Sequence, residues 1–198
     1  RKAIAAKLTT GILKHLADLG MGKTRFEIAV EPEKITATGG DRVEMRISPN
    51  PGEPLKPLNA IASGGEISRV MLALKAVSAD EYGVGAMVFD EIDTGVSGRM
   101  AQAVGEKMAM IAGKRQVLCV THLPQIAALA DRHFVVEKTQ VGERTGSTVR
   151  ALDEEGRAQE IARLIGGAED SPSAMEHAEN MLAAAHRRRE ELRARKEA

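Results

Sequence analysis

Two adjacent carboxylates, Asp90 and Glu91, stand directly after the apolar run Ala86–Phe89. Four consecutive apolar residues are typical of a strand that is buried on both faces of a parallel sheet. Ligands of open α/β sheets bind at the carboxyl ends of such strands. Because successive strand residues point to opposite faces, we expect one acid to hold a metal ion and the other to face a substrate or water. An isolated acid pair is equally compatible with a solvated strand end.

The sequence Ser63-Gly64-Gly65-Glu66 is the second informative stretch. Ser63 and Glu66 have the spacing of a capping box, and the apolar pattern after them predicts a helix. Two glycines in a first helical turn cost roughly 1 kcal/mol each relative to alanine, which capping alone does not explain. Bare backbone N–H groups at a positive helix end allow an anion to approach closely. These residues leave both a phosphate contact and a simple cap open.

A second apolar strand is predicted at 117–120, and it is followed by Thr121-His122. The strand, helix, strand order favours a right-handed parallel crossover. Such a crossover brings His122 to the sheet edge that carries Asp90 and Glu91. A lone histidine is more often structural, but beside two carboxylates a catalytic role is equally well supported.

Other patterns predict the elements that position these residues. Apolar residues at helical spacing predict a helix over 3–19 that stops at Gly20. The helical spacing is already present at the first residues, which suggests the end of a longer coiled-coil helix. Alternation at 26–30 and 43–47 predicts an antiparallel strand pair, and four prolines at 49–57 make an extended connector. Further predicted elements are a helix from about Arg99 to Gly113, a short helix at Pro124, a hairpin from Phe134 to Leu152, a small helix ended by Gly166 and a helical tail from Ser173.

Composition narrows the function classes. The 198 residues include 28 Lys plus Arg and 28 Asp plus Glu, so no overall field attracts nucleic acid or a membrane surface. The single cysteine, Cys119, fits a reducing compartment and excludes a disulfide framework. No apolar run approaches the roughly 20 residues that cross a bilayer, and no signal peptide is present. The chain opens on Arg1 without an initiator Met, so we expect a segment of a longer protein.

Two further stretches can be interpreted either as functional sites or as ordinary surface structure. Gly22-Lys23-Thr24 resembles the end of a phosphate-binding loop, but that motif needs a glycine where Ala17 stands. An ordinary loop lysine is therefore favoured. Residues 186–198 are strongly charged with little apolar face, which favours a solvated or frayed helix over an arm that contacts phosphates.

The order of these motifs resembles the second half of the ATPase head in SMC-like ABC-type ATPases, and it is most similar to the RecN family of bacterial DNA repair proteins. The motifs that carry the resemblance are IASGGEISR at 61–69, FDEIDTGVSGR at 89–99 and VTHLPQIA at 120–127. The implied fold class is α/β, the C-terminal lobe of a P-loop ABC/SMC-type ATPase head, with a largely parallel sheet flanked by helices and a small antiparallel strand pair near the N-terminus. The expected divisions are the end of a coiled-coil helix at 1–19, the lobe itself at 20–185 and a charged helical tail at 186–198.

The resemblance also implies roles for individual residues. Asp90 would be the Walker B acid that holds Mg²⁺ directly or through water, and Glu91 would orient and deprotonate the water that attacks the γ-phosphate. His122 would be the switch histidine that touches the γ-phosphate or that water, and Asp93, in the D-loop, would cross a dimer interface. The signature motif would contact the ATP of the partner head through Ser63, Gly64, Gly65 and Glu66.

Two departures from the pattern stand in the signature motif, where Ala62 replaces the usual Leu and Glu66 replaces Gln. The phosphate loop (Walker A) is absent from these residues, and in this family it lies in an N-terminal lobe beyond the coiled coil. The resemblance therefore implies an ATPase of the bacterial cytoplasm and nucleoid that uses ATP and Mg²⁺, with this segment inactive alone. The implied partners are that N-terminal lobe, a second head in a nucleotide-dependent homodimer and DNA, with no membrane.

Three other functions remain to be weighed against this one. A structural, chromosome-organising tether would use bound ATP to hold two heads together, and its ATP hydrolysis would be incidental. A transporter ATPase subunit is weaker, because such domains usually keep both lobes continuous. A small kinase built on Lys23 has the least support.

Overall fold

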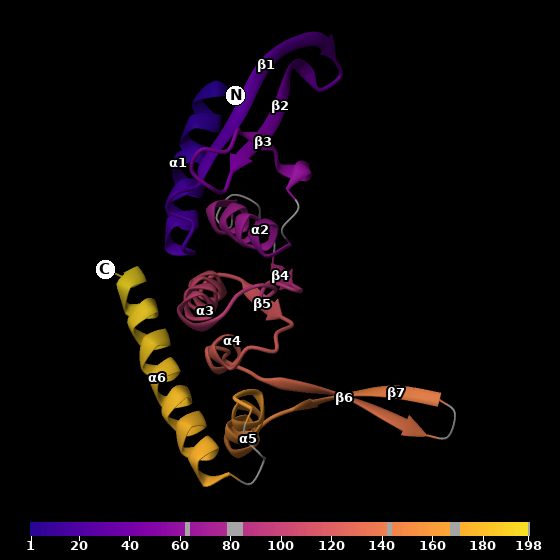
Figure 1. Cartoon of the computed structure of the whole chain (residues 1–198), viewed down its shortest axis with the longest axis vertical. Coiled ribbons are helices and arrows are strands. Elements are labelled where there is room, and N and C mark those ends of the chain that lie inside the picture. Colours follow the sequence, from indigo (N-terminus) through magenta and orange to yellow (C-terminus); the bar gives the residue numbers. More distant parts are fainter. Residues whose placement is uncertain (62–63, 79–84, 142–143, 167–170, 198) are drawn as a thin grey trace. The chain divides into compact units, whose positions relative to one another are not determined.

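The structure, a computed structural model of the chain, describes residues 1–61, 64–78, 85–141, 144–166 and 171–197. Figure 1 shows the elements in chain order from α1 to α6. The chain divides into two compact units, and each is considered by itself. The first contains Arg1–Val96 and Arg115–Val120, and the second contains Ser97–Lys114 and Thr121–Ala198.

The first unit begins with helix α1 (Lys2–Asp18), as its apolar spacing predicts. Ile12 and Leu16 are fully buried, but Ile4 is exposed and Ala5 takes the inward position instead. The chain leaves the helix at Gly20, whose φ of 73° is accessible to glycine without strain. Helix α1 packs against β1 and against α2 (Gly64–Ser78), the helix predicted after the glycine pair.

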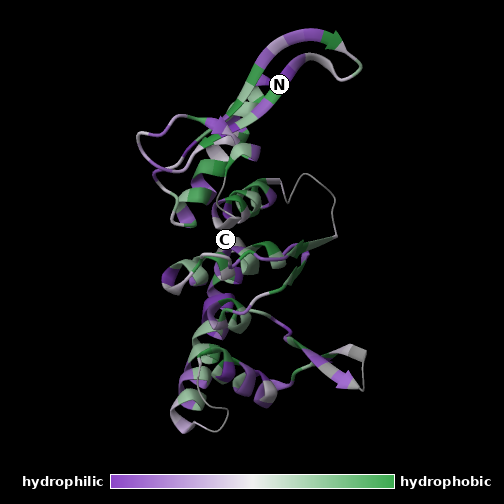
Figure 2. Ribbon diagram, turned by 45° about the vertical axis from the view of Figure 1, so that its right-hand side comes forward, coloured by the Kyte–Doolittle hydropathy of each residue, from purple (hydrophilic) through white to green (hydrophobic). Residues whose placement is uncertain are grey.

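An antiparallel ribbon follows α1, formed by β1 (Arg25–Thr36) and β2 (Gly39–Ser48), and confirms the predicted strand pair. Its base is buried through Phe26, which is paired with Ile47. Its outer part is solvated, and Figure 2 shows hydrophilic residues along both strands. The proline-rich connector adds the two-residue strand β3 (Lys56–Pro57), paired with β2, and the 3₁₀ turn η1 (Leu58–Ala60).

The strands β4 (Ala86–Phe89) and β5 (Gln116–Cys119) pair in parallel, as the crossover argument predicts. The predicted burial on both faces is wrong, because Met87 and Phe89 are buried while Val88 and its register partner Leu118 are exposed. Among the residues that the structure describes, this sheet has two strands and one of its faces is covered. The expected largely parallel sheet is also not formed within the described ranges, where the other sheets, β1-β2-β3 and β6-β7, are antiparallel.

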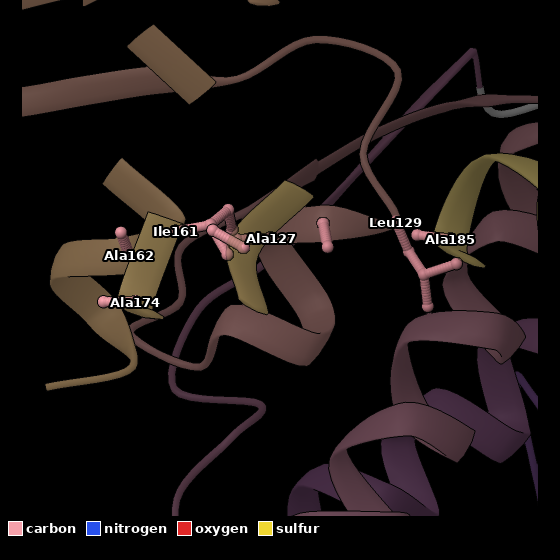
Figure 3. Packing of buried hydrophobic residues seen from close by; sticks show 8 residues of the cluster. Ala127, Leu129, Ile161, Ala162, Ala174 and Ala185 are labelled. Atoms are coloured by element: carbon pink, nitrogen blue, oxygen red, sulfur yellow. The ribbon is translucent and has the colours of Figure 1, made fainter. Parts of the chain in front are cut away.

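The second unit is built mainly from helices around a core of small side chains. Figure 3 shows part of this core, in which Ile161 of α5 lies beside Ala127 of α4. Helix α5 begins at an N-cap, Asp153, whose carboxylate accepts a hydrogen bond of 2.8 Å from the N–H of Gly156. The elements of the unit are α3 (Gly98–Ala112), α4 (Pro124–Ala128), the hairpin strands β6 (Phe134–Val141) and β7 (Arg144–Ala151), α5 (Glu154–Leu164) and α6 (Pro172–Glu197).

The basic end of α6 is held by ion pairs within this unit, which differs from the expected solvated or frayed tail. Arg188 contacts Glu106 of α3 at 2.7 Å, and Asp131 receives Arg189 at 3.1 Å and Arg193 at 2.7 Å. Sequence periodicity could not reveal these pairs, because their acids lie far away along the chain. None of the helices in the described ranges combines the length and the apolar character that a bilayer crossing requires.

Candidate functional site

The carboxyl end of β4 places Asp90 and Glu91 at the surface of the first unit. The strand end is fixed from two sides. The carbonyl of Phe89 accepts a hydrogen bond of 2.9 Å from the N–H of Val120, which extends the parallel pairing beyond β5. Lys75 of α2 lies 4.7 Å from the centre of the Phe89 ring, and its ammonium donates to the Val88 carbonyl at 3.4 Å. The two exposed acids therefore project from a well-anchored strand.

Glu91 has a left-handed backbone, with a φ of 54°, and is the one non-glycine residue of the described ranges with a positive φ. Its N–H donates to the Asp90 carboxylate at 3.0 Å, and its carbonyl accepts from the N–H of Thr94 at 3.2 Å. The two acids thus belong to a turn, so the expected alternation across a continuing strand does not apply to them. A left-handed non-glycine residue costs on the order of 1–3 kcal/mol, and such strain is concentrated at functional sites.

The loop after Glu91 turns back into the unit, and three of its residues are buried while Thr94 and Gly95 are exposed. Ile92, Asp93 and Val96 are each less than a tenth exposed. The carbonyl of Asp93 accepts from the N–H of Val96 at 3.0 Å, which closes a second turn. Asp93 was predicted at a dimer interface, but in this chain its side chain is buried, and the interface role stays a prediction.

The pKa of Cys119, at the end of β5, is affected by the negative charges of this loop. Burial raises the pKa of its thiol to about 12, and the negative charges of Asp93 and Asp90 contribute to the shift. The thiol is therefore inert at neutral pH, and the two aspartates concentrate negative charge where β4 and β5 end. A cation or a cationic contact is favoured at such a place.

The first turn of α2 contacts this same loop, although the two glycines there have different surroundings. A methyl group on Gly65 would overlap the carbonyl oxygen of Thr94, whereas one on Gly64 would meet nothing within 4 Å. Packing inside the chain therefore requires glycine at 65 and does not require it at 64. Ser63, the predicted cap, lies outside the described residues.

Glu66 and Arg69 of α2 line a cavity of about 500 Å³ together with Lys23 and Asn50. The Nε of Arg69 is buried and has no hydrogen-bond partner among the described residues. The lysine of the false phosphate-loop motif thus faces a surface hollow beside α2. Sequence reasoning assigned no role to Arg69, Lys75 or Thr94. Arg69 and Thr94 lie within the quoted motifs, but the relevance of all three residues comes from contacts that only the structure shows.

His122 belongs to the second unit, where it is exposed in the segment between β5 and α4. The hydroxyl of Thr121 accepts a hydrogen bond of 3.1 Å from the N–H of Leu123, which shapes the entry into α4. Pro124, at the first position of α4, is suited to a helix start because its missing N–H would be unused there. The expected meeting of His122 with the two acids remains a prediction.

No group of three or more His, Cys, Asp or Glu side chains in the described ranges is arranged to hold a metal ion by itself. Mg²⁺ at nucleotide sites commonly uses one or two carboxylates, with the remaining positions filled by phosphates and water. The exposed carboxylate of Asp90, at a fixed strand end, is compatible with that mode and not with an all-protein cage.

Comparison with known proteins gives sequence relatives over almost the whole chain, although no family model matches it. The chain is 49% identical over 187 residues to DNA repair protein RecN of Halalkalibacterium halodurans, covering 92% of this chain and 33% of that protein. It is 41% identical over 198 residues to DNA repair protein RecN of Bacillus subtilis, covering 92% and 34% respectively. The chain spans about a third of the length of the curated relatives it matches.

Solved structures show a shared fold at lower sequence identity. An Smc head domain with a coiled coil and joint from Pyrococcus yayanosii matches with a TM-score of 0.61 and 20% identity, over 80% of this chain and 28% of that one. A chain from a study of ATP-driven dimerization and DNA stimulated activation of SMC ATPases matches with a TM-score of 0.53 and 20% identity, over 81% and 92%. The resemblance inferred from the motifs is thereby confirmed: this chain is a relative of the RecN DNA repair proteins, over one third of their length, with the fold of an SMC ATPase head.

Proposed function

We propose that this chain supplies one half of the ATP-hydrolysing site of a RecN-like DNA repair protein. The observation that carries the proposal is the strained Glu91 at the carboxyl end of a parallel strand, on a loop that touches the start of α2. In this proposal Glu91 orients and deprotonates the water that attacks the γ-phosphate. His122 contacts the γ-phosphate or that water.

Asp90 is the residue that would hold Mg²⁺, directly or through water. The ion would supply charge neutralisation for the phosphates, which together with positioning provides most of the catalysis in phosphoryl transfer. The Asp90 carboxylate accepts a hydrogen bond from the Glu91 N–H, and the left-handed turn at Glu91 takes that residue out of the strand. The metal-side role of Asp90 and the water-side role of Glu91 follow from the motif resemblance.

The start of α2 is proposed to contact the nucleotide of a second head in an ATP-dependent homodimer. Gly64 supports this role best, because a methyl group added there would meet nothing within 4 Å and no packing requires a glycine. Backbone N–H groups in a first helical turn are unpaired within the helix and attract phosphate oxygens. Ser63, Gly65 and Glu66 complete the proposed signature motif, and Asp93 is proposed to act at the same interface.

A phosphate-loop lobe of the same polypeptide is the proposed partner of the β4–β5 sheet. Val88 is 61% exposed and Leu118 is 49% exposed, and they are paired on one face, while Val120 continues that face at 63%. Parallel sheets are normally covered on both faces. The relatives are about three times as long as this chain, which provides residues for such a cover.

For the whole protein we propose that ATP binding clamps two heads together and that hydrolysis releases them, coupled to DNA binding and end bridging in recombinational repair. The proposed location is the bacterial cytoplasm, at the nucleoid. The alternatives are a chromosome-organising tether in which turnover is incidental and, with less support, a fragment of a transporter ATPase.

The test replaces Glu91 by Gln in the protein that includes the phosphate-loop lobe. We expect ATP turnover to fall by about 100-fold or more, as a loss of general base catalysis predicts, while ATP-dependent dimerisation persists. Glu33→Gln, the same chemical change at an exposed ribbon residue, is the matched control and should leave turnover unchanged. Normal turnover in the Glu91 variant would refute the assignment, and undiminished DNA bridging without turnover would favour the tether.

A further inference from the structure

The start of α2 and the loop after β4 form a backbone-to-backbone contact. Gly65 is buried against the carbonyl of Thr94, and no side chain fits between them. Thr94 in turn donates its N–H to the carbonyl of Glu91 at 3.2 Å. The first turn of α2 is therefore connected to the backbone of Glu91 through one residue.

This connection is stiff because both sides are anchored. Ile92 and Val96 bury the loop on either side of Thr94. Helix α2 contacts the strand at a second point, where Lys75 donates to the Val88 carbonyl and lies over the Phe89 ring. A displacement of the first turn of α2 toward the loop would push the carbonyl of Thr94, because the two backbones touch with no side chain between them to absorb the movement.

We propose that Gly65 is a positioning residue that couples the two ATP sites of a head dimer through the carbonyl of Thr94. This inference rests on the proposed function, in which α2 contacts the nucleotide of one site and Glu91 of the same chain serves the other. Closure of α2 on one nucleotide then sets the position of Glu91 at the second site. The missing side chain at 65 is required by this internal contact, whereas the missing side chain at 64 is left for the nucleotide.

Mixed dimers of the protein that includes the phosphate-loop lobe separate these two roles. One head carries Glu91→Gln, which silences the site that depends on its own Glu91. The remaining turnover comes from the other site, which uses the Glu91 of the other head and the unaltered α2 of the Gln-bearing head. Gly65→Ala is then introduced into the head that keeps Glu91. Its altered helix start faces only the silent site, so a direct contact with nucleotide cannot affect the active one.

We expect the turnover number of the active site to fall between about 10-fold and 100-fold, because misplacing a catalytic group by about 1 Å costs up to 100-fold. The KM for ATP at the active site should stay unchanged, because that site uses the unaltered α2 of the other head, and a general loss of structure would not permit this. Gly85→Ala in the same head is the matched control, and its turnover should stay within about two-fold of the parent mixed dimer, because a methyl group there meets nothing within 4 Å.

Equal turnover in the Gly65→Ala and Gly85→Ala dimers would overturn the coupling. Normal turnover in a dimer with Glu91→Gln in both heads would instead overturn the proposed function. If Gly65→Ala prevents folding, Thr94→Gly in the same head replaces it, because it keeps Gly65 and lets the Thr94 backbone move away from it. The coupling then predicts the same fall in turnover, and an unchanged rate would refute it.

Discussion

The left-handed backbone of Glu91 makes a prediction about stability that does not depend on catalysis. Glu91→Gly and Glu91→Ala both remove the carboxylate, and they differ only in whether the residue can adopt a positive φ without strain. The structure gives Glu91 a φ of 54°, held by hydrogen bonds to Asp90 and Thr94. We expect the glycine variant to be the more stable of the two, and both to lack turnover.

The size of the difference follows from two opposing effects. A left-handed conformation costs an L-residue about 1–2 kcal/mol, and glycine avoids that cost. Glycine also loses more backbone entropy on folding than alanine, by roughly 0.5–1 kcal/mol. The expected net advantage of Glu91→Gly over Glu91→Ala is therefore about 0.5–1 kcal/mol.

The assay is thermal unfolding of both variants in the protein that includes the phosphate-loop lobe, without nucleotide. For a unit of this size a difference of about 1 kcal/mol moves the midpoint by roughly 2–4 °C. Gln159, exposed in the middle of α5, provides the control pair, because its helical backbone predicts the opposite order. There alanine should be the more stable by about 1 kcal/mol.

Equal midpoints for the two Glu91 variants, or a higher midpoint for alanine, would refute the strained turn. The argument that strain marks Glu91 as functional would then fail, even if turnover were lost. A glycine advantage at both 91 and 159 would point to a general effect of glycine and would remove the support as well.

Three further predictions concern other parts of the chain. Val88→Ser should change the free energy of unfolding by less than about 0.5 kcal/mol. In a titration of the two lobes it should weaken binding of the phosphate-loop lobe about 10-fold, because about 1.4 kcal/mol of apolar burial is lost. Val43→Ser, on the exposed ribbon, should leave that binding unchanged. Arg188→Ala should destabilise the protein by about 1 kcal/mol in urea titrations through loss of its pairs with Glu106 and Glu191, and the exposed Arg187→Ala should not. The pKa of the Cys119 thiol is raised to about 12, so the folded state retains a proton that the unfolded state releases from about pH 9 upward. The free energy of unfolding should therefore decline between about pH 9 and 12. Cys119→Ala should remove that part of the decline when the midpoint of thermal unfolding is measured against pH.

Local elements could be predicted from the sequence because their signals are local. Helix α1 and the β1–β2 ribbon follow directly from apolar periodicities of 3.6 and 2, and the parallel pairing of β4 with β5 follows from the strand, helix, strand order. The motif residues Asp90 and Glu91 were found because acids directly after an apolar run are a recognisable pattern. What these signals could not provide is the backbone conformation of Glu91, which is set by a turn and not by the strand before it.

Contacts between distant residues account for what the sequence did not reveal. Gly64 and Gly65 cannot be distinguished in the sequence, because both are glycines. They differ in the structure, where only Gly65 lies against the carbonyl of Thr94. Val88 is apolar like Met87, but apolarity does not say which face is covered within this chain. Arg188 is one of a run of basic residues until its partner Glu106 is known.

The two-stranded sheet of β4 and β5 also has a consequence for solubility. Within the described residues these strands pair only with each other, so each leaves an outer row of N–H and C=O groups without a strand partner, and of these the Val88 carbonyl accepts from Lys75. Open strand edges beside an apolar face are templates for pairing with another chain, and they promote aggregation. Expressed without a lobe that completes the sheet, the chain is expected to self-associate at these edges, and co-expression with that lobe should raise the soluble yield.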